Sequence, residues 1–405
     1  MWLRVAALLE SVILFFSGLF VSAFNLPDRK TQALIEQNGG FIRGVCHPNQ
    51  NYDLLKEGGF TWVRFDIPYP YTANGSISAS YLAFKTRCRG YAERGFKVMA
   101  ITPYPHDYIN IGGFNPVAPE NAEKTQAIAV FLYEDLKDVC AAFQITNEMG
   151  IDAFTYPLTL EEGAKFIGIQ LEALAPITEG FPIGYNSAGL NLSLHRLMKP
   201  YHRYCDYVGL DLYNGNDNHD NAQDYISRIR RVYRLTHLPV ILQEFGFLSE
   251  GAPKTPEEKK EILMSYGYAS EEEARADLDA FVRKLPAAFQ QRLVQSGRPA
   301  EEWGDLIFGD YRAHFYCERS AVTYNNVGHT PQGQAAYYAD LLPKLRRVSC
   351  LAGTILYCCQ DGSVCWFCGQ RGCPSETRWG IVDENGDPKP AYDAIRACFT
   401  SEAFQ

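Results

Sequence analysis

Two glutamates lie at the ends of apolar segments, and their type and spacing could support acid–base and nucleophilic chemistry. Glu148 falls in FQITNEMG (143–150) and Glu244 in LPVILQEFGF (238–247). A buried parallel strand ends where a barrel opens to solvent, so a carboxylate at its end reaches the mouth of the barrel. Two carboxyl groups that face each other are sufficient to cleave a glycosidic bond. The pair therefore points to glycoside chemistry, provided that both strands end at the same face.

The elements that must position the two glutamates are eight short apolar segments that alternate with helical patterns. Their continuous apolar character is typical of parallel strands buried on both faces. Eight strand-then-helix units predict an α/β fold, a closed (β/α)8 or TIM barrel. A doubly wound open sheet is the alternative, but GVCHPNQN after the first strand is not a Gly-rich phosphate loop. The expected strands are GFIRGVC (40–46), FTWVRFDI (60–67), FKVMAIT (96–102), FQITN (143–147), PIGYNSA (182–188), YVGLDLY (207–213), PVILQEF (239–245) and GTILYC (353–358), with helices expected at 78–95, 122–143, 159–177, 221–237 and 333–347.

The spacing of the glutamates fits this barrel. Glu244 lies 96 positions after Glu148, which leaves room for three strand–helix units of about thirty residues each. They would then end strands four and seven. The next connection is longer and carries a helical block at 255–285, so we expect an insertion (255–331) inside a single catalytic domain of residues 24–405. An insertion after a strand's carboxyl end lies beside the site, so it is either a substrate wall or lid or a surface elaboration without function.

Asn147-Glu148 at the end of strand four and Glu244 at the end of strand seven resemble clan A of the glycoside hydrolases. These are retaining (β/α)8 enzymes that include cellulases, mannanases and β-galactosidases. The resemblance implies that Glu148 is the general acid/base and Glu244 the nucleophile. It also implies a retaining O-glycoside hydrolase that cleaves β-glycosidic bonds of an oligo- or polysaccharide through a covalent glycosyl-enzyme.

The same resemblance implies supporting roles for four further residues. Arg64 in TWVRFDIP would keep the nucleophile ionised, and an arginine inside an apolar strand is costly unless it is paired. Asn147 would hydrogen-bond the sugar 2-hydroxyl, a contact that strengthens in the transition state. Tyr213 would donate its hydroxyl to Glu244, and an ordinary tyrosine at the barrel mouth is the alternative. His47 in GVCHP could reach a sugar hydroxyl or be a loop histidine satisfied by backbone.

Aromatic side chains cluster near the expected strand ends and could stack on sugar rings. We select only Trp366 among them as a substrate-binding candidate. Clan A commonly has a tryptophan at the end of strand eight, where this chain has Tyr357, and a proline after the acid/base glutamate, where it has Met149. For Trp379 we expect packing that closes the barrel. The aromatic cluster comprises Tyr69, Tyr71, Tyr104, Tyr108, Tyr156, Phe247 and Trp366.

Two other classes of function compete with the hydrolase. A transglycosidase would use the same intermediate and a sugar hydroxyl instead of water. A non-catalytic carbohydrate-binding barrel would be expected to lack one of the two glutamates, and this chain has both. A Schiff-base lyase needs a lysine at the carboxyl end of a strand, whereas Lys97 lies near the start of strand three.

Composition narrows the partners. The chain has 405 residues, 46% hydrophobic and 21% charged, with a formal charge of −9 and no basic tract. These values describe a globular protein with a large core and disfavour nucleic acid as a partner. We expect a carbohydrate substrate, no cofactor and no metal, and the sequence leaves the oligomeric state, the sugar and exo or endo action open.

The N-terminus has features of a secretory leader. Arg4 precedes an apolar stretch at 12–21, and Val21-Ser22-Ala23 resembles a signal-peptidase site. Residues 1–23 are therefore a cleaved signal peptide or an uncleaved apolar helix, which could contact a membrane. A leader implies a secreted or cell-surface protein, and a cytoplasmic location is the alternative.

Cysteines concentrate near the C-terminus. Five of the twelve fall between Cys358 and Cys373 in YCCQDGSVCWFCGQRGC. Cys365-x-x-Cys368 with Cys373 and either Cys358 or Cys359 could hold a structural zinc, but a second Cys-x-x-Cys is missing. The pattern favours disulfides or free thiols over metal. Cys46, Cys140 and Cys205 lie in or beside apolar strands, where inert core thiols are expected.

Overall fold

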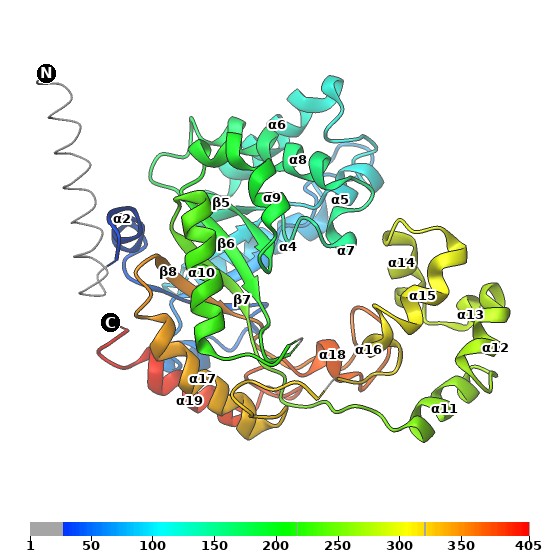
Figure 1. The fold of residues 1–405 in the computed structure, drawn as a ribbon. Helices are drawn as coiled ribbons and strands as arrows, with labels where there is room; N and C mark the ends of the chain where they lie inside the picture. Colours follow the sequence, from blue (N-terminus) through cyan, green and yellow to red (C-terminus); the bar gives the residue numbers. More distant parts are fainter. Residues whose placement is uncertain (1–26, 217, 320, 405) are drawn as a thin grey trace, which may run out of the picture.

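A computed structural model describes residues 27–216, 218–319 and 321–404. It confirms the (β/α)8 prediction, because eight strands close into one barrel in the order β1 to β8 (Figure 1). All eight expected segments form strands. Their bounds are β1 (Ile42–Cys46), β2 (Trp62–Asp66), β3 (Lys97–Ile101), β4 (Ala142–Ile145), β5 (Ile183–Ala188), β6 (Tyr207–Leu212), β7 (Val240–Phe245) and β8 (Leu351–Leu356).

Each neighbouring pair of strands is parallel, and β1 pairs with β8 to close the ring. Parallel strands need covering helices on the outer face, and the strand residues are almost all buried as a result. The strands therefore end together at one face, where the loops that follow them meet.

Helices cover the outside of the barrel and begin at residues suited to cap them. Thr159 with Glu162, and Asn221 with Asp224, form reciprocal capping boxes at two of these helices. The helices outside the insertion are α2 (Arg29–Gln37), α3 (Tyr52–Glu57), α4 (Ala79–Ala92), α5 (Pro105–Asn110), α6 (Ala122–Leu136), α7 (Asp152–Thr155), α8 (Leu160–Leu174), α9 (Leu192–Leu197), α10 (Ala222–Thr236), α17 (Pro331–Leu345), α18 (Pro374–Thr377) and α19 (Pro390–Phe399).

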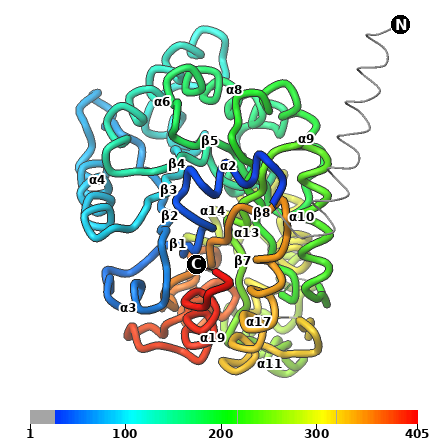
Figure 2. The backbone as a smooth tube through the Cα atoms, turned by 90° about the vertical axis from the view of Figure 1, so that its left-hand side faces the viewer, coloured from blue at the N-terminus to red at the C-terminus, as the bar shows by residue number. Residues whose placement is uncertain are grey.

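Helix α2 closes the end of the barrel where the strands begin, opposite their carboxyl ends. Leu34 of this helix belongs to the same buried cluster as Ile42 and Trp62, the first residues of β1 and β2, and Met99 of β3. Figure 2 shows α2 crossing this end, near the C-terminus of the chain. Because this end is plugged, access to the interior runs through the opposite end.

Six short helices between β7 and α17 form a lobe beside the barrel (Figure 1). The lobe has a hydrophobic cluster of its own, in which Phe281, Phe289 and Phe315 are fully buried. Cysteines of the loop after β8 belong to the same cluster, so this loop packs on the lobe. The lobe helices are α11 (Pro256–Ser265), α12 (Glu271–Ala276), α13 (Leu278–Lys284), α14 (Ala287–Gln295), α15 (Trp303–Phe308) and α16 (Arg312–Phe315).

Two helical predictions differ from the structure in extent. The helix expected at 122–143 ends at Leu136, because β4 needs the residues from Ala142 onward. The block expected at 255–285 is three helices, interrupted near Gly267, whose φ of 88° is left-handed. The segment 1–23 lies outside the described residues. Across the part that is described, no helix is long and apolar enough to cross a membrane.

Close packing between β1 and β8 requires a glycine at position 353. A Cβ added there would lie 2.1 Å from Cβ and 2.8 Å from Cα of Ile42. We expect Gly353→Ala to lower the free energy of unfolding by about 1–3 kcal/mol, because neither strand can move away. Urea denaturation measures this. Gly328→Ala is the control, since nothing lies within 4 Å of its added Cβ; equal midpoints for the two variants would contradict the packing argument.

Candidate active site

A cavity of about 1020 Å³ opens at the carboxyl ends of the strands. Loops after the strands line one side of it, and the lobe together with the loop after β8 lines the other. On the barrel side it is lined by His47, Asp66, Tyr104, Asn147, Glu148, Asp211, Tyr213, Glu244, Tyr357 and Trp379. On the lobe side it is lined by Gln291, Arg292, Gln295, His314, Arg319, Trp366, Phe367 and Glu376.

The structure brings Glu148 and Glu244 together in this cavity. Glu244 is the next-to-last residue of β7, whereas Glu148 lies three residues beyond the end of β4. The backbone at Thr146 and Glu148 is left-handed, with φ of 49° and 44°, an arrangement that costs energy in residues other than glycine and often marks functional sites. The amide N–H of Glu148 donates to Oδ1 of Asn186 at 2.8 Å, which holds this turn in place.

The two carboxyl groups lie close together and are largely removed from water. One carboxyl oxygen from each of Glu148, Asp211 and Glu244 lies within 4.8 Å of the other two. Only 8% of Glu148 and 6% of Glu244 are exposed. At this separation two negative charges repel strongly in a buried site, so both glutamates are not readily ionised at once.

Both carboxyl oxygens of Glu244 accept a hydrogen bond from a neighbouring side chain. Nη1 of Arg64 lies 2.5 Å from Oε1, and the hydroxyl of Tyr213 donates to Oε2 at 2.5 Å. The guanidinium is 1% exposed, so the ion pair is a buried one. A buried charge needs this kind of full pairing, because desolvation otherwise costs several kcal/mol.

The amide of Asn147 is oriented by three donors. Its Oδ1 accepts from Nη2 of Arg64 at 2.7 Å, from Nε2 of Gln144 at 2.8 Å and from Nδ2 of Asn186 at 2.7 Å. The side-chain N–H groups of Asn147 therefore remain available to donate toward the cavity. A fixed amide donor beside the two carboxyl groups is suited to bind a hydroxyl of a ligand.

Burial raises the pKa of Glu148 well above its ordinary value, and the nearby charge of Glu244 raises it further. The Arg64 guanidinium opposes this rise only in part. Asp211 of β6 hydrogen-bonds Glu148, and its own pKa is raised by burial and by the charges of Glu244 and Glu148. Glu148 is therefore suited to carry a proton near neutral pH, while Glu244 keeps the only guanidinium contact of the pair.

His47 and Trp366 also reach the cavity, from opposite sides. His47 has a left-handed φ of 46°, packs edge-on against Tyr357 and lies 3.8 Å from Asp66. Trp366 is 41% exposed, and its indole N–H donates to Glu376 at 3.0 Å. Its exposed ring is available for stacking against a ligand.

The remaining aromatic candidates lie in the cavity, in the core or at the surface, where Tyr156 is exposed and Tyr71 is partly buried against the core. Tyr104 lines the cavity, and its hydroxyl donates to Asp66 at 2.7 Å. Tyr69, Tyr108 and Phe247 are buried in the barrel core instead. Trp379 is 3% exposed and packs on Tyr213, in line with the expected packing, and it also lines the cavity, which was not expected. Barrel packing and cavity lining are thus combined in one ring.

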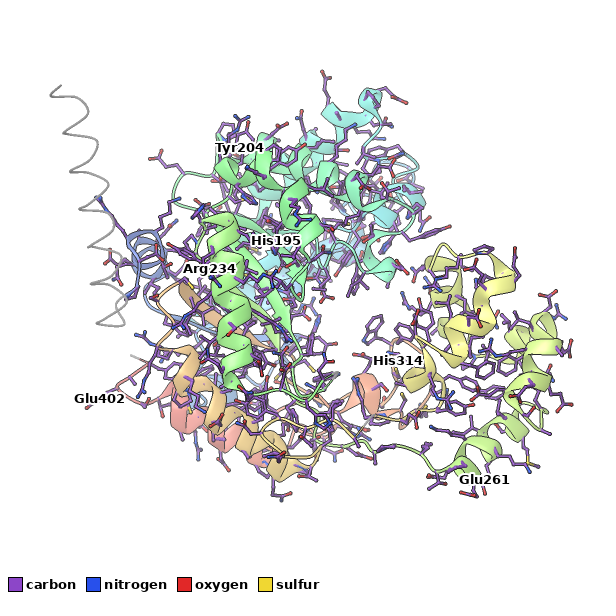
Figure 3. All side chains as sticks on the ribbon, in the orientation of Figure 1. His195, Tyr204, Arg234, Glu261, His314 and Glu402 are labelled. Carbon is purple, nitrogen blue, oxygen red and sulfur yellow. The ribbon has the colours of Figure 1, made fainter. Side chains whose placement is uncertain are left out.

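Several residues of the site were missed from the sequence. Asp211 and Asn186 lie inside expected strands, and an inward-facing polar residue near a strand's carboxyl end is the signal that could have found them. Asn186 donates to Asp211 at 2.6 Å as well as to Asn147, so it connects the acidic group to the amide. Glu376 and His314 come from the lobe side, where no motif marks them. Figure 3 shows His314 on the side of the lobe that faces the barrel.

The three carboxylates also form a donor set that could attract a divalent cation. The Arg64 guanidinium already occupies one face of Glu244, and Asp211 hydrogen-bonds Glu148. A proton and a guanidinium therefore balance much of the negative charge, as acid–base chemistry by two carboxyl groups requires.

No protein-family model and no curated protein matches this chain. Solved structures share its fold at low sequence identity. The catalytic domain of a GH53 protein from Ignisphaera aggregans aligns with a TM-score of 0.53 at 15% identity, over 88% of this chain and 95% of that one. A family 39 glycoside hydrolase from Bacteroides cellulosilyticus aligns with a TM-score of 0.55 at 13% identity, over 88% of this chain and 63% of that one.

A GH2 β-galacturonidase from Eisenbergiella tayi also aligns, with a TM-score of 0.51 at 14% identity. The alignment covers 90% of this chain but only 52% of the galacturonidase, so this chain spans about half the length of that protein. At these identities the likeness shows the fold alone.

The raised pKa of Asp211 predicts a cost in stability that grows with pH. The folded-state pKa lies above the unfolded value of about 3.9, so stability is lost as pH rises above that value. We expect Asp211→Asn to increase the free energy of unfolding at pH 8, where the parent must ionise a buried carboxyl group, and to change it little at pH 4. Urea titrations at both pH values measure this, with exposed Asp279→Asn as the control. A variant less stable than the parent at pH 8 would contradict the prediction.

Proposed function

We propose that this protein is a retaining glycoside hydrolase that cleaves β-glycosidic bonds of an oligo- or polysaccharide. The observation that carries the proposal is the closeness of Glu148 and Glu244, since one carboxyl oxygen of each lies within 4.8 Å of the other in the cavity at the strand ends. Retaining enzymes hold their carboxyl groups about 5–5.5 Å apart, whereas inverting enzymes need about 6.5–9.5 Å to admit a water. The close pair supports direct attack on the sugar.

In the first step, the carboxylate of Glu244 attacks the anomeric carbon and forms a glycosyl ester. Glu148 gives its proton to the glycosidic oxygen, so that the bond breaks and the leaving sugar departs as an alcohol. Its raised pKa supports this role, since the proton is held near neutral pH.

In the second step, Glu148, now a carboxylate, takes a proton from water. The water oxygen attacks the anomeric carbon, the ester to Glu244 breaks, and the product keeps the original anomeric configuration. Once the sugar has left, Glu244 returns to its contacts with Arg64 and Tyr213, which stabilise it as a leaving group.

The neighbouring residues support a sugar as the ligand. The free amide donor of Asn147 suits the 2-hydroxyl, and the exposed ring of Trp366 suits an apolar sugar face. The solved structures that share the fold include a β-galacturonidase, a β-glucuronidase and a family 39 glycoside hydrolase, which supports a carbohydrate substrate.

The nucleophile assignment predicts the effect of Glu244→Gln. An amide cannot form the glycosyl ester, so we expect kcat to fall by at least about 1,000-fold while the fold is kept. Activity is measured on whichever aryl β-glycoside or polysaccharide the parent cleaves in a panel screen, and circular dichroism checks the fold. Glu261→Gln makes the same change on the exposed surface of the lobe and should leave kcat unchanged. Near-normal turnover by Glu244→Gln would refute the assignment.

The acid/base assignment predicts a dependence on the leaving group in Glu148→Ala. Substrates with poor leaving groups should slow by about 10²–10⁴-fold, whereas an activated aryl glycoside needs no proton and should still form the intermediate. Azide should then restore turnover and yield a β-glycosyl azide, because the small anion fills the space left by the carboxylate. Equal losses on both substrates, without azide rescue, would exclude Glu148 as the acid/base.

A further inference from the structure

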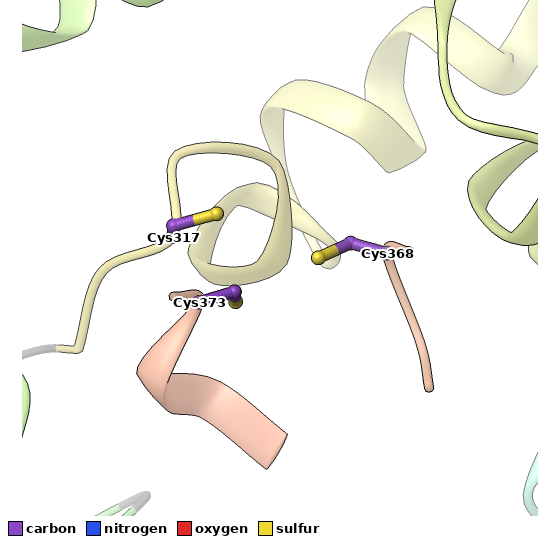
Figure 4. A group of neighbouring side chains, drawn as sticks. All are labelled: Cys317, Cys368 and Cys373. Carbon is purple, nitrogen blue, oxygen red and sulfur yellow. The ribbon is translucent and has the colours of Figure 1, made fainter. Parts of the chain in front are cut away.

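Four cysteines from two separate segments of the chain converge in the lobe. The sequence alone does not reveal that they lie close together in space. Cys317 follows α16, whereas Cys365, Cys368 and Cys373 lie in the loop between β8 and α18. The sulfurs of Cys317, Cys368 and Cys373 all lie within 4.8 Å of one another, and Figure 4 shows these three side chains pointing inward from separate stretches of backbone. Cys365 contacts two of them, since its thiol hydrogen-bonds Cys368 and Cys373.

The cluster has the form of one four-sulfur site. The thiol of Cys373 hydrogen-bonds each of the other three, so no cysteine stands apart. Tetrahedral zinc with bonds of about 2.3 Å to sulfur places neighbouring sulfurs about 3.8 Å apart, a spacing that fits the 4.8 Å limit for the sulfurs of Cys317, Cys368 and Cys373. Cys365, beside Cys368 and Cys373, would complete the tetrahedron. Two disulfides would instead divide the four sulfurs into two bonded pairs, and none of the four is bonded in the structure.

The local backbone supports a metal site as well. Cys365 and Cys368 have the Cys-x-x-Cys spacing of zinc ligands, and the amide N–H of Cys368 donates to the sulfur of Cys365 at 3.4 Å. A backbone N–H directed at sulfur stabilises a thiolate ligand. Three of the sulfurs are fully buried, and the surrounding cluster is aromatic, so water is excluded as in closed structural sites.

We propose that Cys317, Cys365, Cys368 and Cys373 bind one structural zinc ion that fastens the loop after β8 to the lobe. The site corrects the grouping expected from the sequence, because Cys317 takes the place of Cys358 or Cys359. The half-buried Cys358 donates to the backbone carbonyl of Gln360, and Cys359 is buried in the barrel core.

The zinc would fix the positions of side chains on the lobe side of the cavity without itself lining the cavity. Cys317 lies between His314 and Arg319 in the sequence. Trp366 lies between Cys365 and Cys368, and Glu376 follows Cys373 by three residues. All four of these neighbours line the cavity. These side chains lie on the short helices α16 and α18 and on the segments beside them, and the zinc would cross-link the two. The metal therefore fixes the geometry of the lobe side without contacting the two catalytic candidates on the barrel side.

Metal analysis of the full chain tests the proposal independently of any activity. The protein is purified under reducing conditions from zinc-supplemented medium, and zinc is counted by inductively coupled plasma mass spectrometry. We expect one zinc per chain in the parent, loss of at least nine-tenths of it in Cys368→Ser and in the half-buried Cys317→Ser, and one zinc in Cys398→Ser, which changes a cysteine of α19 outside the cluster.

Cobalt substitution of the parent provides a second readout that does not depend on whether the variants fold. Co²⁺ bound by four thiolates gives intense thiolate-to-metal charge-transfer absorption and the visible bands of a tetrahedral ion. A parent that binds neither zinc nor cobalt would overturn the proposal. So would thiol titration of a separate preparation, purified without reductant and then unfolded, that finds four thiols fewer than the twelve cysteines, because the cluster would then be two disulfides.

Discussion

The guanidinium of Arg64 is buried inside the barrel, where an isolated charge would cost several kcal/mol. Its hydrogen bonds to Glu244, Asn147 and Gln144 join strands two, four and seven at their carboxyl ends. Each partner is thereby fixed: one oxygen of the carboxylate is bound, and the amide of Asn147 is turned so that its donors are free. The geometry of the cavity follows from satisfying this one cation.

The same cation divides the acidic groups into two kinds. Three acidic residues each place one carboxyl oxygen within 4.8 Å of the others, and Arg64 forms its ion pair with Glu244. The remaining two, Glu148 and Asp211, are buried near that negative charge, and the pKa of each is raised in consequence. A carboxyl group paired with a guanidinium, beside one whose pKa is raised, is the combination that a nucleophile and a general acid require.

Much of the fold was predictable because its signals are local. Eight continuously apolar segments separated by helical patterns indicate a parallel barrel, and strand order then places Glu148 and Glu244 at the same face. Arg64 could be selected because an arginine in an apolar strand implies a buried partner. Asp211 could not be selected in this way, since its importance comes from its distance to Glu148, which the pleat and the register of β5, β6 and β7 decide.

The lobe side was much less predictable. Cys317 joins Cys365, Cys368 and Cys373 only through packing of the inserted helices, across a stretch of chain that includes α17 and β8. His314, Arg319 and Glu376 reach the cavity for the same reason. Trp379 illustrates a different limit, since a buried ring that closes the barrel can also form part of a cavity surface, and its sequence context is the same in either case.

The covalent intermediate on Glu244 can be sought directly by mass spectrometry. A 2-deoxy-2-fluoro glycoside with an activated aryl leaving group slows both steps through its electron-withdrawing fluorine, and the good leaving group keeps the first step faster than the second, so a retaining enzyme accumulates its glycosyl ester. With the sugar that the protein accepts, we expect the intact mass to rise by one fluoroglycosyl unit and peptide mapping to place it on Glu244. Two results would contradict the account. One is release of the aryl group as fast as from the substrate without fluorine, with no increase in protein mass. The other is a label on another residue.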